Sequence, residues 1–349
     1  MLRWGILGVN TTAEESVGPA MRTVGHDLAV VSASTLTAAQ QFAATQGVRR
    51  ARHEHADVLA SRDVDAVFVA LPTSEREHWV VEALNAGKHV LCLKPLSIDA
   101  DGAARMAAAA AGGGDVAETA GAAARPLRSE GARAVRDDAM PPESGRNVRS
   151  DLVLMEALPL RFHPRTAAML ELVRSGGIGA VRLVSATSAY PMTDADSYHA
   201  DPARGGGALL DVGADLVSLI RWVIGEEPEV VRAVTRRWAS GADATTSAVM
   251  GFPSGATATL HASFDSARHS TLEIVGSDGT LRMPRPFTAG PGDQAALLRS
   301  DEVIGSWRAD PWERLLEAFE QATHGVRPPI DVEDAVATAH VIDWIAASS

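Results

Sequence analysis

The sequence predicts an α/β protein with two domains: a doubly wound parallel sheet in the N-terminal part, and a C-terminal α+β domain built on a large open, mainly antiparallel sheet. The chain of 349 residues is too long for one comfortable hydrophobic core. Residues 2–98 alternate between strand-like and helix-like segments, which is typical of βα units in a parallel sheet. Residues 230–283 instead contain consecutive strand-like segments joined by turns such as Ser277-Asp278-Gly279.

The first domain is expected to span residues 1–111. Its apolar segments are typical of strands buried on both faces, and the intervening segments of helices that cover the sheet. An alanine-rich helix over 97–111 ends at Gly112-Gly113-Gly114. The expected strands are 2–8, 27–34, 65–71 and 88–93. Of the expected helices, the first ends near Thr23, the second runs through Phe42 and the third spans 75–86.

Residues 112–150 form a separate segment of low complexity. They contain glycine, alanine, arginine and acidic residues, with Pro141-Pro142 and almost no bulky apolar side chains. Such a composition buries too little area to offset the entropy of ordering it. The sequence leaves two interpretations open, a disordered insertion and a mobile lid.

The second domain is expected over residues 151–349, with roles in substrate binding and oligomerisation. A strand over 152–160 precedes a helix from about Pro164 to Gly176 and a strand over 181–190. The two C-terminal helices are amphipathic and can pack back on the first domain. The remaining expected strands are 230–240, 245–252, 256–264 and a hairpin within 270–283, and the C-terminal helices are 312–325 and 332–348.

Composition excludes several functional classes. The net charge of −12 and the pI near 5.4 argue against nucleic acid and anionic membranes as partners. The single cysteine, Cys92, cannot form an internal disulfide, which fits a reducing cytoplasm. No apolar run reaches the length of a membrane span, and Met1 leads directly into a strand rather than a signal peptide.

Lys94 is the strongest candidate for a functional side chain. It follows the expected buried strand 88–93 and precedes Pro95, which keeps its backbone extended. Ligands of doubly wound sheets bind beyond the carboxyl ends of the strands. The sequence therefore directs an ammonium group into the ligand crevice.

The turn after the first strand is a candidate phosphate-binding loop. Gly8 and Ala13 suit the first and third positions of the dinucleotide fingerprint, but Asn10 occupies the second, where a glycine lets pyrophosphate approach. A plain strand-to-helix turn is an equally good interpretation. The expected second strand ends in Ser34-Thr35-Leu36, which provides neither the acidic residue that favours NAD nor the arginine that favours NADP, with Arg49 and Arg50 only a distant alternative.

A third candidate combines three glycines with two carboxylates. Gly205-Gly206-Gly207 allows a tight loop or a close backbone approach, and Asp211 and Asp215 are one helical turn apart on one face. Two carboxylates facing Lys94 can hold sugar hydroxyls or move protons, although a surface helix start explains the pattern as well. No metal site is predicted, and His53 and His55 are expected to be solvated.

Taken together, these segments resemble the Gfo/Idh/MocA family of NAD(P)-dependent oxidoreductases, in the branch with glucose-fructose oxidoreductase, dimeric dihydrodiol dehydrogenase and xylose dehydrogenase. The resemblance covers nearly the whole chain apart from residues 112–150. It implies an N-terminal Rossmann domain and an open C-terminal sheet that packs against a second subunit, as a homodimer or homotetramer. The stretches that carry it are RWGILG, DVDAVFVALPT, NAGKHVLCLKPL, LVLMEALPLRFHP, GGIGAVRLV, ADPARGGGALLDVG, LEIVGSDGTLRMPRPF and WERLLEAF.

The resemblance also implies roles for individual residues. Lys94 matches the catalytic lysine, with Leu93 replacing the usual glutamate before it, and Asp215 occupies the place of the acid/base tyrosine or histidine. Substrate contacts are expected from Arg161, His163, Tyr198 and Asp211. Contacts with NAD or NADP are expected from Gly8, Asn10, Thr11, Thr12, Ala13, Ser34, Thr35, Leu71, Pro72, Thr73, His78, Lys94 and Pro95.

The resulting hypothesis is a cytoplasmic oxidoreductase that moves a hydride between a nicotinamide cofactor and a hydroxyl or ketone of a sugar-like substrate. Lys94 would polarise the reacting oxygen, and Asp215 would accept or relay its proton. The alternative is a degenerate family member without redox turnover, which acts as a binding or regulatory protein or in acid/base chemistry. Cofactor binding distinguishes the two hypotheses.

Overall fold

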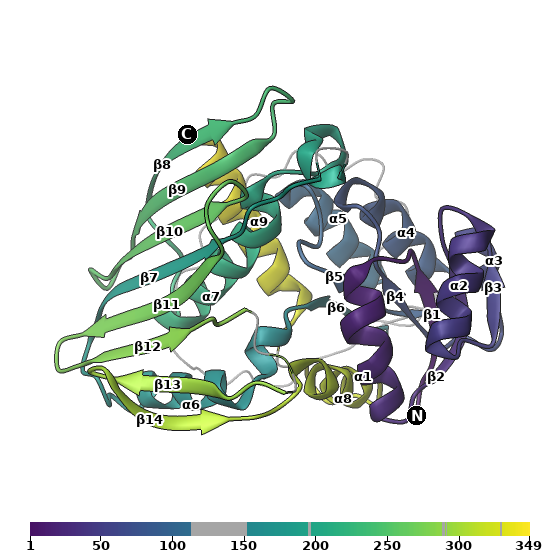
Figure 1. The fold of residues 1–349 in the computed structure, drawn as a ribbon, viewed down its shortest axis with the longest axis horizontal. Helices are drawn as coiled ribbons and strands as arrows, with labels where there is room; N and C mark the ends of the chain where they lie inside the picture. The colour runs from purple at the N-terminus through teal and green to yellow at the C-terminus, as the bar shows by residue number, and fades with distance from the viewer. Residues whose placement is uncertain (113–151, 195–196, 288–289, 291, 329) are drawn as a thin grey trace, which may run out of the picture.

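The computed structural model describes residues 1–349 except 113–151, 195–196, 288–289, 291 and 329 (Figure 1). The expectation for residues 112–150 therefore lies outside the described residues, apart from Gly112. No helix in the described part of the chain is both long and apolar enough to cross a membrane.

The first sheet is parallel and has six strands in the order β3-β2-β1-β4-β5-β6, as expected for a doubly wound fold. Every residue of β4 is buried, because helices cover both faces. The strands are β1 Arg3–Leu7, β2 Asp27–Ser32, β3 Arg50–Arg52, β4 Ala66–Val69, β5 His89–Leu93 and β6 Leu154–Ala157. The helices between them are α1 Gly18–Thr23, α2 Leu36–Gln46, α3 His55–Leu59, α4 Thr73–Asn85 and α5 Ala100–Ala110.

β6 corrects two expectations. The strand predicted over 152–160 is only Leu154–Ala157, because Pro159 begins a 3₁₀ turn that runs to Phe162. It pairs in parallel with β5, from Val90 opposite Leu154 to Leu93 opposite Ala157. The first domain therefore takes its last strand from beyond the boundary expected at residue 151.

The second sheet has eight strands in the order β14-β13-β12-β11-β7-β10-β9-β8. Among the described strands of this sheet, only β7 and β10 pair in parallel, so the sheet is mainly antiparallel as predicted. The hairpin β13–β14 was not anticipated from the sequence. The strands are β7 Val181–Ala189, β8 Val230–Arg237, β9 Asp243–Gly251, β10 Thr257–Ser263, β11 His269–Gly276, β12 Thr280–Pro284, β13 Ala295–Arg299 and β14 Glu302–Trp307.

Helices α6 (Pro164–Arg174), α7 (Ala214–Ile224) and α9 (Val332–Ala347) pack on one face of the second sheet, toward the first domain (Figure 1). The two C-terminal helices also pack on the first domain, as the sequence allowed. Helix α8 (Pro311–Thr323) lies beside α1 and shares a core with Trp4. Ala335 and Ala339 of α9 pack in the core on the opposite side of the first sheet. The two domains are therefore joined by a buried interface.

Candidate active site

The turn after β1 requires glycine at its first position. Gly8 has φ +88°, and a Cβ there would lie 2.8 Å from Ala70 O. Asn10 closes the turn with its own side chain: Oδ1 accepts the Ala13 N–H at 2.9 Å, and Nδ2 donates to Ala70 O at 3.1 Å. Asn10 thus uses a backbone N–H that a phosphate would otherwise receive.

Lys94 follows β5 and crosses to the second domain. Its Nζ donates to Asp211 O at 2.7 Å and to Asp211 Oδ1 at 2.9 Å, and lies 3.1 Å from Asp215 Oδ2. Asp211 lies in the π-helical turn 209–213 and Asp215 in the first turn of α7, so the expected one-face spacing is confirmed. The surface-helix interpretation is wrong, since all three side chains are about four-fifths buried.

The glycines before this helix permit a close approach of the two domains. Gly205 has φ +74°, and a Cβ there would lie 2.7 Å from the side chain of Thr73, at the start of α4. Gly207 has φ +120° and packs directly on Asp243. Asp243 in turn accepts the Leu209 N–H at 2.8 Å, which holds the N-terminal end of the helix that carries Asp211.

The ammonium of Lys94 lies between two carboxylates whose pKa values shift in opposite directions. Burial alone would lower the pKa of Lys94, but Asp211 and Asp215 together raise it above its ordinary value. Burial would raise the pKa of Asp211, yet Lys94 and His199 hold it below its ordinary value. Burial raises the pKa of Asp215, and Lys94 opposes this only in part. Lys94 therefore stays charged, and Asp215 is the carboxyl group that takes up a proton more readily.

Tyr190 extends this cluster from the end of β7. Its Oη donates to Asp211 Oδ2 at 3.1 Å, and His199 Nε2 lies 3.9 Å from the same oxygen. The Nδ1 of His199 is hydrogen-bonded to Ser197 Oγ at 2.8 Å. Burial, followed by the charge of Asp211, raises the pKa of Tyr190, so its phenol remains neutral.

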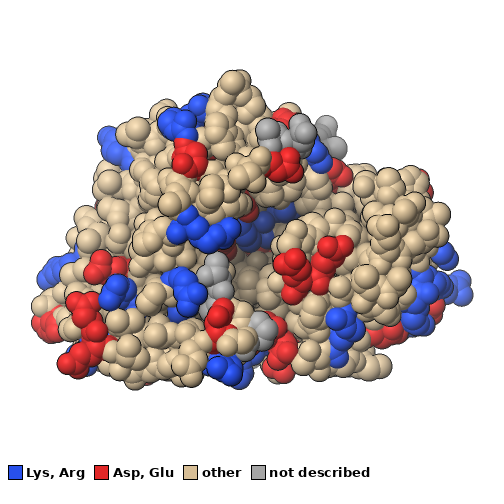
Figure 2. Space-filling view, in the orientation of Figure 1, with Lys and Arg blue, Asp and Glu red and all other residues tan. Residues whose placement is uncertain are grey.

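These groups open into a cavity of about 470 Å³ between the two domains. Figure 2 shows a hollow in the middle of the molecule on the face it presents. Its lining includes Thr12, Glu15 and Ser16, which follow the turn after β1, together with Lys94, Tyr190 and Asp215. The cavity thus joins the helix N-terminus that follows the Gly8 turn to the largely buried Lys94. This arrangement suits a dinucleotide whose reactive ring lies near Lys94.

His163 also lines the cavity and is 2% exposed. Its Nδ1 accepts the Arg165 N–H at 3.0 Å, so the ring proton of the neutral imidazole is on Nε2. That Nε2 has no hydrogen-bond partner among the described residues. Burial, aided by the charge of Arg165, lowers the pKa of His163 to about 4, which makes it a neutral donor available to a bound substrate.

Two expected site residues lie away from the Lys94 cluster, and a third borders it. Arg161 donates to Ser218 O at 2.8 Å and pairs with Asp334 at 2.8 Å, so it joins α7 and α9 instead of facing substrate. His78 is exposed on α4 with its ring against Trp79. Tyr198 does not line the cavity, but it stacks on His199 with ring centroids 4.0 Å apart, and the charges of Asp211 and Lys94 act on its hydroxyl.

The residues expected to contact the adenosine half of the dinucleotide are the next group. Ser34 and Thr35 are exposed after β2, and Thr35 Oγ1 accepts the Ala38 N–H to cap α2. Arg49 pairs with Asp27, and Arg50 with Asp63, so neither guanidinium is free. His55 corrects another expectation: it is half-buried, and its Nδ1 lies 2.7 Å from Ser32 Oγ in a hydrogen bond.

Two buried charged residues support Lys94 and were not identified from the sequence. Arg76 donates to Leu71 O, Leu93 O and Pro95 O, which joins the carboxyl ends of β4 and β5. Glu156, interpreted from the sequence only as part of a strand, accepts the Leu96 N–H at 2.7 Å. Among the described residues, no group of three or more His, Cys, Asp or Glu side chains is placed to hold a metal ion.

Fold and site together define a dinucleotide-dependent oxidoreductase. Residues 2–119 match the model of an oxidoreductase family with an NAD-binding Rossmann fold, and residues 166–282 match the model of the GFO/IDH/MocA C-terminal domain. The chain belongs to the Gfo/Idh/MocA family of NAD(P)-dependent oxidoreductases.

Two of the relatives are named as oxidoreductases of sugars. The chain is 31% identical to D-xylose 1-dehydrogenase (NADP(+)) 2 of Haloferax volcanii, over 99% of this chain and 96% of that protein. It is 30% identical to the dTDP-3,4-didehydro-2,6-dideoxy-alpha-D-glucose 3-reductase of Streptomyces violaceoruber, over 93% and 83%. A 3-ketoreductase from Actinomadura kijaniata, solved with NADP and TDP-benzene, superposes with a TM-score of 0.83 at 25% identity, over 99% and 97%.

Proposed function

We propose that this protein transfers a hydride between a nicotinamide cofactor and a secondary hydroxyl or ketone of a sugar-like substrate. The observation that carries the proposal is the position of Lys94, a charged amine at the carboxyl end of β5, inside the interdomain cavity and fixed by Asp211 and Asp215. When bound there, the dinucleotide donates or accepts the hydride.

Lys94 is the group proposed to polarise the reacting oxygen. A charged donor whose own side chain is largely buried stabilises the negative charge that develops on a carbonyl oxygen as it becomes an alkoxide. The two carboxylates fix the ammonium before substrate arrives, which avoids the cost of orienting it during the reaction. The family resemblance alone would assign the proton transfer to Asp215, which takes up a proton more readily than Asp211.

The test combines binding with turnover. NADPH and NADH are titrated at micromolar concentration by the change in their fluorescence, and activity is measured with a panel of aldoses, ketoses and nucleotide-linked ketosugars. The proposal expects binding of at least one cofactor and oxidation or reduction of at least one sugar. In a folded Lys94→Met variant, turnover falls by about 10²-fold or more. Cofactor binding without any turnover, or no binding of either cofactor, would favour a binding or regulatory protein instead.

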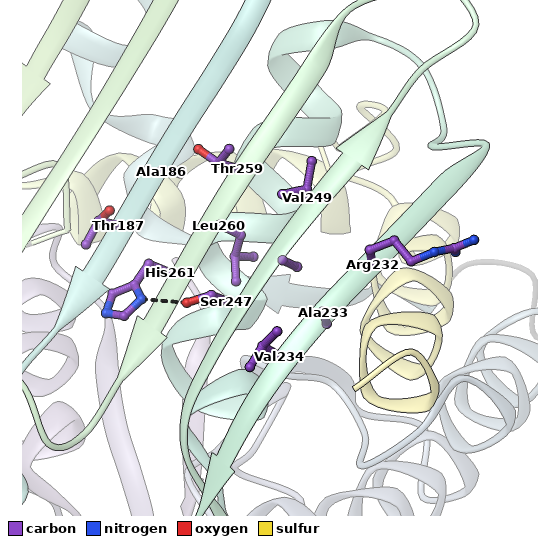
Figure 3. Close-up of a pocket in the computed structure, with 11 residues that line it drawn as sticks. Ala186, Thr187, Arg232, Ala233, Val234, Ser247, Val249, Thr259, Leu260 and His261 are labelled. Atoms are coloured by element: carbon purple, nitrogen blue, oxygen red, sulfur yellow. Dashed lines mark hydrogen bonds between the residues drawn. The ribbon is translucent and has the colours of Figure 1, made fainter.

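We further propose that the protein is a cytoplasmic homodimer or homotetramer, assembled through the second sheet. The sheet face opposite α6, α7 and α9 has no helix on it among the described residues. Figure 3 shows side chains on this face from β7, β10, β9 and β8, with Ser247 hydrogen-bonded to His261 at 2.8 Å. Val234 and Val249 are 76% and 54% exposed there. Cys92, buried and unpaired, fits the reducing cytoplasm.

Sedimentation velocity tests the assembly. Val234→Glu places a charge on the proposed interface and is expected to shift the protein toward monomer. The matched control is Val326→Glu, which changes an equally apolar, 54% exposed valine in the loop after α8. A wild-type monomer, or an assembly unaffected by Val234→Glu, would contradict the proposed interface.

A further inference from the structure

The site contains two carboxylates but reduction of a ketone requires a proton donor. Asp215 stands where the family resemblance places a tyrosine or histidine, and its Oδ2 lies 3.1 Å from the ammonium of Lys94. Lys94 favours the charged form of this carboxyl group, which partly offsets the rise that burial gives to its pKa. A neutral donor close to Lys94 would be better suited to protonate an alkoxide.

Tyr190 has the required position. It follows β7 directly and lines the same cavity as Lys94 and Asp215. Its hydroxyl is 3.1 Å from Asp211 Oδ2, and Asp211 Oδ1 is 2.9 Å from Lys94 Nζ, so one carboxylate holds both groups. At 3.1 Å the phenol hydrogen bond is long for O–H···O⁻, and it can be exchanged for a bond to a substrate oxygen.

The ring of Tyr190 is held on two sides. Its centroid lies 5.1 Å from that of Phe264, and the guanidinium of Arg268 lies 5.5 Å from the Tyr190 ring. Packing of this kind fixes the direction of the hydroxyl, as proton transfer requires. Tyr198, the chain's only other tyrosine, stacks on His199 outside the cavity wall.

We infer that Tyr190 exchanges the proton with the substrate oxygen in the proposed reaction, in place of Asp215 at the family's acid/base position. Asp215 then serves as a counter-ion that keeps Lys94 charged. The inference rests on the proposed function and assigns a proton donor to the same site.

In the reductive direction, the substrate is a ketone and the cofactor is the reduced nicotinamide. The substrate carbonyl carbon receives a hydride, with its electron pair, from the reduced nicotinamide, which is thereby oxidised. The carbonyl π pair moves to oxygen, and that oxygen takes the proton of Tyr190 Oη as the phenol O–H bond breaks. The charge of Lys94 partly offsets the effects of burial and Asp211 on the phenolate, which regains a proton from water after product leaves. Oxidation follows the reverse path.

Tyr190→Phe tests the inference, because it removes the hydroxyl and keeps the packed ring. We expect kcat to fall by about 10²-fold or more, while KM and the Kd for NADPH change by less than about threefold. Asp215→Asn keeps a polar group beside Lys94 and is expected to lower kcat less than Tyr190→Phe does. A Tyr190→Phe enzyme with kcat within about threefold of wild type overturns the inference and leaves the proposed function intact. A wild type without turnover counts against the proposed function itself.

A second measurement is independent of turnover. With two tyrosines in the chain, the difference between ultraviolet pH titrations of wild type and Tyr190→Phe isolates the ionisation of Tyr190. Its phenol is expected to ionise above the ordinary value of about 10, or not before the protein unfolds, and Asp211→Asn should bring it back toward that value. If the pKa of Tyr190 is about 10 both in wild type and in Asp211→Asn, Tyr190 does not face Asp211. That result would refute the inference even without a known substrate.

Discussion

Glu156 accepts a hydrogen bond from the backbone N–H of Leu96 at 2.7 Å, and this bond holds the turn that carries Lys94. Glu156 lies on β6 and is 2% exposed, and its second oxygen has no hydrogen-bond partner among the described residues. Burial raises the pKa of Glu156 to about 7. A carboxyl group that titrates near neutral pH thus lies directly behind the proposed catalytic lysine.

This relationship predicts a pH dependence of stability. The pKa of Glu156 is raised from 4.5 to about 7 in the folded protein, so the folded state binds the proton more tightly than the unfolded state. Its contribution is fully present below about pH 4.5 and is lost as the pH rises through about 7. Between pH 5 and 8, wild type should lose on the order of 3 kcal/mol relative to Glu156→Gln, which does not titrate. Urea unfolding at both pH values measures this, and parallel curves for the two proteins would contradict it.

We predict that Asn10 limits the affinity of the protein for its dinucleotide cofactor. Its Oδ1 occupies the Ala13 N–H, and Asn10→Gly frees that donor for a phosphate. We expect the Kd for NADPH or NADH to fall by up to about tenfold, the equivalent of one hydrogen bond. Gly8→Ala is the opposite control, because its Cβ meets Ala70 O and should weaken binding. An unchanged Kd in Asn10→Gly for both cofactors would mean that this turn does not set affinity.

His163 predicts a separable effect on substrate binding. His163→Asn keeps an acceptor for the Arg165 N–H at the start of α6 but withdraws the donor from the cavity. Loss of one neutral hydrogen bond should raise KM for the sugar by about fivefold and leave the Kd for the dinucleotide unchanged. Steady-state kinetics and fluorescence titration measure the two quantities. An unaltered KM would remove His163 from the substrate wall.

We predict that replacing Arg161 lowers the stability of the protein without weakening substrate binding. Its guanidinium is 5% exposed, and it pairs with Asp334, which also pairs with Arg221. Arg161→Met leaves a partly buried carboxylate with one partner fewer and should cost about 2–3 kcal/mol of unfolding free energy. A double-mutant cycle with Asp334→Asn should give a coupling energy of the same order for the Arg161–Asp334 pair. If instead KM rises and stability is unchanged, Arg161 contacts substrate after all.

The sequence was sufficient for features that depend on local pattern. Parallel strands place Lys94 at the ligand edge, and helical spacing places Asp211 and Asp215 on one face, so their meeting follows from rules of chain geometry. Other features depend on contacts between distant segments. Tyr190 meets Asp211 only because the second sheet brings the end of β7 beside the start of α7.

The buried charges escaped prediction for an energetic reason. An arginine or glutamate within a helix or strand is expected to face water, because burial without partners is costly. Arg76 and Glu156 are buried because the loops after β4 and β5 supply backbone partners that no local pattern reveals. Arg161 was misassigned for the converse reason: its partner Asp334 belongs to the last helix of the chain.

β6, α8 and α9 follow the rest of the first domain in the sequence but complete it, which affects synthesis of the protein on the ribosome. When β5 emerges, the strand that pairs with it and two of the helices that cover the sheet have not yet been made. A nascent chain ending at residue 111 would expose the edge of β5 and apolar patches around Trp4 and Leu91, surfaces that invite association with other chains. The dinucleotide-binding half should therefore depend on chaperones until the C-terminal helices are released, and it should not be obtainable as a stable fragment.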